Sequence, residues 1–176
     1  RLYGHIATAF QTPTTSELGN RPTGEGGFNP DLEPERILGF ETGLRRHIQR
    51  LHLDIDLALY QLQVTDALIP FQVESPDSEE IYFRNAGQTQ NRGLELALSA
   101  TLRPDLRALL AYTFGDYVFE DYQIETDAGR LQLAGNEVPG VPRHRLFTSL
   151  GYQHSKGLFA DIEVERVGRY WANDFN

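Results

Sequence analysis

The stretch at residues 82–102 constrains the fold more than any other part of the chain. From Gly93 onward, leucines alternate strictly with small or polar residues such as Glu95 and Ser99. Successive side chains of a β-strand point to opposite faces, so this pattern predicts an extended strand with one apolar and one polar face. The preceding residues are polar and extended in character. We therefore predict one continuous strand from Phe83 to Leu102, far longer than the usual strand of a soluble sheet.

Six further segments are predicted to be strands that could pair with it: residues 1–10, 35–45, 51–60, 106–119, 143–153 and 158–171. The segment at 51–60 has the most regular alternation, with leucines and isoleucine opposite Asp54 and Asp56. Aspartate is a poor β former, so its face must meet water. The sequence thus predicts about seven antiparallel strands that form a sheet with one face exposed to water.

The predicted connections between these strands alternate between long and short. The long ones are residues 11–34, 64–80 and 120–142, and the short ones are 46–50, 103–105 and 154–157. The first long segment is rich in glycine and proline, which argues against regular structure over most of it. Long loops at one end and short turns at the other are typical of outer-membrane barrels. Soluble sandwiches need not sort their loops in this way.

Aromatic residues gather near the predicted long-loop ends: Phe10, Tyr60, Tyr82, Phe83, Tyr117, Phe119, Tyr122, Tyr170 and Trp171. Aromatic side chains with a polar edge favour the lipid headgroup level, so the pattern predicts an aromatic belt at the external interface. The alternative is a hydrophobic core at one end of a soluble β domain. The fold class we predict is all-β, an antiparallel transmembrane β-barrel.

Composition excludes several classes of function. The chain has 16 Lys and Arg against 25 Asp and Glu, a net charge of −9, which argues against binding nucleic acid. It has no cysteine, and its five histidines show neither metal-ligand spacing nor a paired nucleophile. Asp54 and Asp56 share a face, but a hard cation needs about six oxygens. We therefore predict no catalytic residue, no metal site and no cofactor.

Short motifs follow one another along almost the whole chain. They are F-x-x-P-x-x-x-E-L at residues 10–18, N-P-D-L-E-P-E at 29–35, G-F-E-T-G at 39–43, N-A-G at 85–87, G-L-E at 93–95, P-G-V-P-R-H at 139–144 and G-R-Y at 168–170 with Asn173, Asp174 and Asn176 after it. In this order and spacing the chain resembles the TonB-dependent receptors of Gram-negative outer membranes. Glu33 departs from the family, in which that position is more often basic.

The resemblance implies a 22-stranded barrel with an N-terminal plug, of which residues 1–176 form part of the single barrel domain. The chain begins at Arg1 and has no methionine, so we expect an internal or processed piece of a larger protein. The resemblance implies that its strands lie in the last third of the barrel, without plug, TonB box or closing strands. The function implied is import of a scarce ligand across the cell outer membrane, with a ferric siderophore favoured. TonB, acting through the plug, would supply the energy, and outer-membrane lipid and lipopolysaccharide would be further partners.

The resemblance implies that external loops recognise the ligand, frequently through aromatic and arginine side chains. The candidate ligand-binding residues of this type are Phe28, Phe71, Arg84 and Arg130. Six polar residues are expected to face the lumen: Glu41, Asp54, Asp56, Glu95, Ser99 and Thr101. The glycines at 39, 43, 87 and 93 are expected to permit close backbone approach or strand bending. Three alternatives remain open: a soluble seven-stranded sandwich that acts as a binding module, an outer-membrane porin, and a barrel enzyme.

Overall fold

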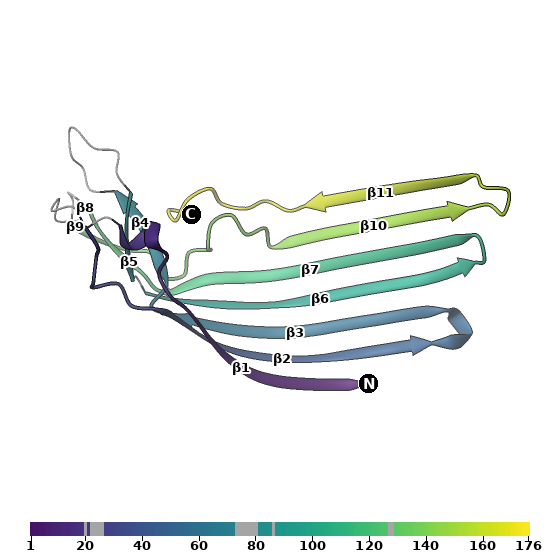
Figure 1. Ribbon diagram of the computed structural model, residues 1–176, viewed down its shortest axis with the longest axis horizontal. Coiled ribbons are helices and arrows are strands. Elements are labelled where there is room, and N and C mark those ends of the chain that lie inside the picture. Colours follow the sequence, from purple (N-terminus) through teal and green to yellow (C-terminus); the bar gives the residue numbers. More distant parts are fainter. Residues whose placement is uncertain (20, 22–26, 73–80, 86, 127–128) are drawn as a thin grey trace.

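The computed structural model describes residues 1–19, 21, 27–72, 81–85, 87–126 and 129–176. Its main feature is one seven-stranded antiparallel sheet in the order β1-β2-β3-β6-β7-β10-β11, which is open at both edges (Figure 1). The strands are β1 (Leu2–Gln11), β2 (Glu35–Ile48), β3 (Leu53–Thr65), β6 (Gln88–Arg103), β7 (Leu106–Asp121), β10 (His144–Gln153) and β11 (Phe159–Val167). Seven long strands in one sheet confirm the predicted number and pairing.

The long connections all lie at one end of this sheet and the short turns at the other (Figure 1). Two of the long loops contain hairpins of their own, formed by β4 (Leu68–Gln72) with β5 (Ile81–Asn85) and by β8 (Gln123–Thr126) with β9 (Gly129–Gln132). Within the described ranges, these hairpins are the other two sheets of the chain. A soluble sandwich needs a second large sheet, so the structure contradicts that alternative.

The predicted single strand from Phe83 to Leu102 is wrong. Its first part is β5, which pairs with β4 in a separate hairpin, and β6 begins only at Gln88. Gly87 stands between them with a φ of +74°, a left-handed conformation that glycine adopts without strain. A Cβ at this position would overlap the backbone of Asp121. The break therefore depends on the conformation and close approach of one glycine, which alternation does not reveal.

Two short helical segments occur in connections. The helix α1 (Thr15–Leu18) lies in the first long loop, which was predicted to be mostly irregular, and a capping box between Thr14 and Glu17 begins it. The turn between β2 and β3 contains η1 (Gln49–Leu51), and β2 continues to Ile48 rather than ending at Arg45 as predicted. No helix among the described residues is long and apolar enough to cross a membrane.

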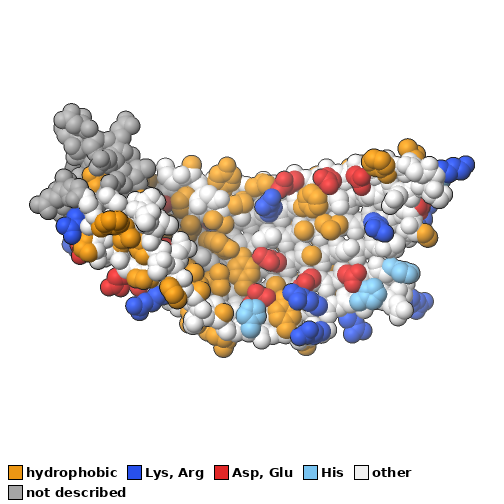
Figure 2. Space-filling model, in the orientation of Figure 1, with side chains coloured by type: hydrophobic (Ala, Val, Ile, Leu, Met, Phe, Trp, Pro, Cys, Tyr) orange, Lys and Arg blue, Asp and Glu red, His pale blue; other side chains and the backbone are white. Residues whose placement is uncertain are grey.

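The strand register sorts side chains by face as predicted. One row of paired positions reads Leu44, Leu57, Leu96, Tyr112 and Leu146, and the neighbouring row reads Gly43, Ala58, Glu95, Thr113 and Arg145. We call the two sides the apolar face and the polar face. Figure 2 shows a view of the molecule in which acidic, basic and histidine side chains lie along the sheet among hydrophobic ones.

The sheet has little core of its own. Large apolar side chains of the apolar face are exposed, for example Ile6 at 69% and Ile162 at 65%. The compact hydrophobic cluster of buried residues instead lies among the long loops, around Phe119 and Tyr122. A water-soluble protein rarely leaves such a face uncovered, so this sheet needs an apolar environment on one side.

Candidate functional site

The long loops are joined at their bases into one unit. We call it the external platform and define it as residues 27–35, 66–72, 81–85, 119–138 and 173–176, so far as the structure describes them. Asn85 connects two of its loops: its Nδ2 donates to the carbonyls of Glu33 at 2.8 Å and Asp66 at 2.6 Å, and its Oδ1 accepts from the Glu33 N–H at 2.7 Å. One amide side chain thus fixes the first long loop against the second.

A hydrophobic cluster joins the second long loop to the third. Ile69 of β4 packs with Phe119, Tyr122 and Leu133, and all four are buried. The rings of Phe119 and Tyr122 are 4.7 Å apart between centroids. Burial of apolar area on this scale stabilises the hairpins against water by a few kcal/mol in all.

The last residues of the chain close the platform. The Tyr122 hydroxyl donates to Asp174 Oδ2 at 3.1 Å, and the Asn176 side chain accepts from the Glu137 N–H at 2.8 Å and donates to its carbonyl at 2.7 Å. Burial, together with the charge of Asp174 nearby, raises the pKa of Tyr122 to about 12. The residues that carry the family resemblance here therefore serve to build the loops.

The four residues predicted to bind ligand lie on or beside this platform, in three different long loops. Arg84 lies on β5, and its Nη2 donates to the carbonyl of Gln123 at 3.2 Å, which links the two hairpins. Arg130 lies on β9 and is exposed. Phe28 is 65% exposed in the first long loop. Phe71 stands on β4 with its backbone opposite Tyr82, and its side chain lies outside the described part of the structure.

Sequence reasoning missed an ion network at the base of the third long loop. Asp116 Oδ2 lies 2.7 Å from Arg92 Nη2, and Asp116 Oδ1 lies 3.0 Å from Arg143 Nη2. Arg143 also contacts Glu137 at 3.3 Å. The Asp116 side chain is only 13% exposed, so these charges are partly shielded from water. No local sequence motif predicts the network, because the pairing register of β6 against β7 brings its residues together.

Two aspartates predicted to face water have side-chain partners on the polar face. Asp54 lies 2.7 Å from His47 Nδ1, and Asp56 lies 2.9 Å from Arg45 Nε. Both aspartates thus have partners that a bound cation would have to displace. Across the described residues, no group of three or more His, Asp or Glu side chains is placed to hold a metal ion.

The predicted aromatic belt is wrong for five of its members. Tyr60 and Tyr117 lie on the polar face, where their hydroxyls are 2.9 Å apart. Tyr82, Phe119 and Tyr122 are buried in the platform. Aromatic spacing alone could not distinguish headgroup contact from these two environments.

Three of the four glycines singled out in the sequence lie where neighbours approach closely on the polar face. A Cβ on Gly93 would come within 2.5 Å of the Tyr60 hydroxyl, and a Cβ on Gly39 within 2.8 Å of Leu62. At Gly43 it would meet the Tyr3 ring. With Gly87 at the break before β6, all four positions confirm the expected close approach or bend.

The apolar face ends toward the long loops along a sharp polar border. Gln61, Arg92 and Asp116 stand in a single register row, which on this face is the next one after the row of Leu59, Leu94 and Phe114. On β6 the apolar positions run from Leu94 to Leu102. Nine residues at about 3.3 Å each cover roughly 30 Å of tilted strand, which suits the apolar band of about 25 Å in a membrane barrel.

The border also runs obliquely across the strands. On β2 the apolar residues of this face reach Leu38, which pairs with Gln63, yet on β3 they end at Leu59, four positions nearer the short turns. On β11 they end at Val164, which pairs with Thr148, still nearer the short turns. An oblique border is what a membrane plane leaves on tilted strands.

Comparisons with known proteins agree with this geometry. The family model described as "TonB dependent receptor-like, beta-barrel" matches residues 1–176. The chain belongs to the TonB-dependent receptors. It is therefore part of an outer-membrane β-barrel of a Gram-negative bacterium, and the open sheet is a segment of that barrel. Members of this family are transporters and not enzymes, in line with the sequence prediction.

Several solved structures share the fold. "Copper transporter OprC" is 17% identical, with a TM-score of 0.75 over 98% of this chain. The ferric-catecholate import receptor Fiu from E. coli K12 is 16% identical, with 0.68 over 95%, and the ferric yersiniabactin uptake receptor FyuA from Yersinia pestis is 19% identical, with 0.66 over 98%. The match covers 25%, 22% and 24% of those chains. The chain thus spans about a quarter of the length of the TonB-dependent receptors it matches.

Proposed function

We propose that this segment belongs to a receptor that imports a scarce metal chelate, with a ferric siderophore the favoured ligand and TonB supplying the energy. The observation that carries the proposal is the external platform, a set of loops fixed to one another by Asn85, the Tyr122 cluster and the last residues of the chain. Loops joined to one another above a transmembrane wall form a surface on which a ligand can be held before transport.

Two arginines of the loop hairpins supply cationic groups for an anionic ligand. Arg84 and Arg130 lie on adjacent loop hairpins, and guanidinium groups bind carboxylate or catecholate oxygens through charge-assisted hydrogen bonds. Phe28, exposed in the first long loop, and Phe71 on β4 add aromatic groups that suit the rings of an aryl chelate. Iron-chelating siderophores combine these two chemical features.

The printed descriptions of similar structures support the same class of ligand. Fiu is described as a ferric-catecholate import receptor, FyuA as a ferric yersiniabactin uptake receptor and PiuA of Acinetobacter baumannii as a siderophore receptor. OprC is described as a copper transporter, so copper is a second candidate. The polar face would line the passage, because its paired charges remain in contact with water.

The experiment is a binding and uptake assay on the full-length receptor. The probes are a ferric tris-catecholate, a ferric tris-hydroxamate and Cu²⁺, and binding is followed by quenching of intrinsic fluorescence. Arg130→Ala should weaken binding of the preferred ferric probe about ten-fold, the value of one charge-assisted contact. Arg50→Ala, in the short turn at the opposite end of the sheet, is the matched control and should leave binding unchanged.

Uptake of radiolabelled iron by cells then distinguishes a receptor from a porin. The proposal predicts that uptake stops when TonB is deleted from the host. Passive entry that persists without TonB would contradict it. Saturable binding of Cu²⁺ with no binding of either ferric probe would replace iron with copper as the cargo.

A further inference from the structure

The three short turns of the main sheet lie side by side at one end of it (Figure 1). We call residues 46–52, 103–107 and 154–157 the turn rim. Backbone hydrogen bonds join each turn to the next strand pair: the Thr101 N–H donates to the His52 carbonyl at 3.0 Å, and the Gln153 N–H donates to the Asp105 carbonyl at 2.9 Å. Since neighbouring strands of a sheet are about 4.8 Å apart, successive turns repeat roughly every 10 Å along the rim.

The turn rim is basic although the chain as a whole is acidic. Of the 16 Lys and Arg and the 25 Asp and Glu in the sequence, the rim contains five and one. Its cations, all exposed, are Arg46, Arg50, Arg103, Arg107 and Lys156. Arg103 lies 3.6 Å from Asp105, and the other four form no ion pair with any residue that the structure describes. The rim therefore presents a row of positive charges to its surroundings.

Lipid headgroups do not account for all of these charges. The apolar face reaches the rim at Leu102, which is 56% exposed, so the membrane border passes close to the turns. Arg107, however, stands in the register row of Thr101 and Gly151, which lies on the polar face and away from lipid. The short turns of an outer-membrane barrel point to the periplasm. A partner that contacts Arg107 thus approaches from the aqueous periplasmic side.

We propose that the turn rim binds an anionic periplasmic polymer whose carboxylates repeat along its length. Successive turns supply Arg50, Arg107 and Lys156, and each of these cations can form a charge-assisted hydrogen bond with a carboxylate. A single small anion would contact one turn only. A polymer contacts several turns at once, and linked weak contacts give a high overall affinity without a deep pocket.

Peptidoglycan has this chemistry, because its stem peptides carry free carboxylates, and it is the probe for the test. The turn rim is at the opposite end of the sheet from the external platform. The proposal is therefore independent of the imported ligand.

The test is co-sedimentation of the full-length receptor, in a neutral detergent, with purified peptidoglycan sacculi at low ionic strength. The double variant Arg50→Gln/Arg107→Gln should bind about ten-fold more weakly, because two charge-assisted contacts are lost. Sacculi whose carboxylates have been converted to amides should bind the wild type as weakly. Added salt should release the wild type from untreated sacculi, since salt screens exposed charges.

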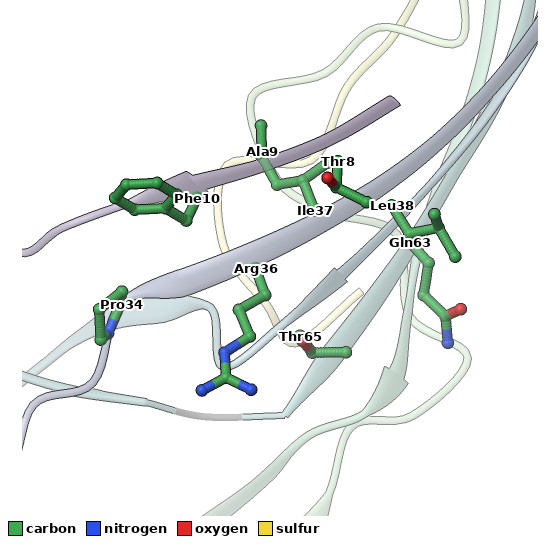
Figure 3. A pocket seen from close by; sticks show the side chains of 9 residues that line it. All are labelled: Thr8, Ala9, Phe10, Pro34, Arg36, Ile37, Leu38, Gln63 and Thr65. Carbon is green, nitrogen blue, oxygen red and sulfur yellow. The ribbon is translucent and has the colours of Figure 1, made fainter. Parts of the chain in front are cut away.

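The matched control removes two exposed arginines near the long-loop end of the sheet. Arg36 lies on β2 opposite Thr65 and lines a groove beside β1 (Figure 3). Arg166 lies on β11 opposite Leu146. The variant Arg36→Gln/Arg166→Gln changes the net charge of the receptor by the same amount as the test variant, and it should bind sacculi like the wild type.

Folding of each variant is checked by circular dichroism, and the arm with amidated sacculi needs no variant to fold. Equal binding by folded Arg50→Gln/Arg107→Gln and the wild type would overturn the proposal, as would undiminished binding to amidated sacculi. An equal loss in the control would also overturn it, because binding would then follow net charge alone. Native mass spectrometry with added phosphatidylglycerol tests the other partner: lower lipid retention in the test variant, with unchanged binding to sacculi, would assign the rim to lipid.

Discussion

Single side chains decide how the loops of this receptor segment are held. Asn85 satisfies two carbonyls and one N–H from separate loops, and Gly87, two residues later, lets the chain turn into β6. Both residues belong to the N-A-G motif at residues 85–87, one of the motifs that carry the family resemblance. Their physical role became clear only when the partners, Glu33 and Asp66, were placed beside them.

Asn85→Ala should loosen the second long loop without unfolding the barrel. It leaves the carbonyls of Glu33 and Asp66 without these donors, at a cost of about 1–3 kcal/mol. Hydrogen exchange should therefore accelerate in β4 and β5 and stay unchanged in β6 and β7. Asn91→Ala is the control, because Asn91 Oδ1 has no hydrogen-bond partner among the described residues. Equal exchange in the two variants would contradict the role given to Asn85.

The effect of an introduced charge on the free energy of unfolding should depend on whether the residue lies on the apolar or the polar face of the sheet. Leu96→Arg places a guanidinium on the apolar face and should lower the free energy of unfolding by about 2–4 kcal/mol near mid-bilayer. Ser99→Arg, three residues away on the polar face with Asp54 paired opposite, should change it by less than about 1 kcal/mol. Denaturant titration of the receptor in lipid vesicles measures both. Similar losses in the two variants would be incompatible with a wall that has one lipid side.

At the scale of elements, alternation and loop length were sufficient to predict the strands of the main sheet. They did not predict that the strand before Gly87 belongs to a loop hairpin and ends there. The polar residues 85–90 look extended throughout, yet Gly87 separates a loop hairpin from the transmembrane strand. The hairpins β4-β5 and β8-β9 were missed because they are stabilised by packing between loops, around Ile69 and Leu133, and distant packing leaves no periodic signal.

The ion network should determine the order of the segment between β7 and β10. Asp116→Asn removes the charge shared by Arg92 and Arg143 and leaves two arginines at a partly buried site. We expect a loss of about 1–3 kcal/mol and faster hydrogen exchange at residues 133–143. Asp121→Asn, an exposed position on the same strand, is the control. Unchanged exchange in Asp116→Asn would show that the network is not structural.

The platform should also loosen at high pH. The pKa of Tyr122 is raised to about 12 by burial and by Asp174, whereas an exposed tyrosine titrates near 10. The folded state thus holds the phenol proton more tightly than the unfolded state does. This contribution to stability is complete below about pH 10 and is lost as pH rises through 12.

An alkaline titration followed by tyrosinate absorbance measures this effect. The wild type should show one more high-pH ionisation than Tyr122→Phe, which cannot ionise at this position. A difference between the two titrations centred near pH 10 would mean that Tyr122 is not buried as described.

At the scale of the whole molecule, the main sheet is part of a barrel wall that has one apolar face and one polar face. The border of the apolar face passes through Gln61, Arg92 and Asp116 and runs obliquely across the sheet as a whole, and the polar face holds ion pairs such as Arg45 with Asp56. The two faces could be predicted from the sequence because successive side chains of a β-strand point to opposite faces of the sheet. The positions of Arg84 and Arg130 relative to each other were beyond sequence reasoning, since loop geometry depends on contacts between loops.

The central claim is that β6 crosses the membrane with its leucines toward lipid, and spin labels test it most directly. Single cysteines are placed at positions 94 to 99 of a full-length receptor in which any cysteine outside this segment has been replaced by serine, and the receptor is reconstituted in lipid vesicles; the segment itself contains no cysteine. Collisions with dissolved oxygen and with a water-soluble nickel chelate are then measured at each label. The account predicts high oxygen accessibility at 94, 96 and 98 and lower values at 95, 97 and 99. Equal accessibility at all six positions, or nickel contact at the leucine positions, would contradict it.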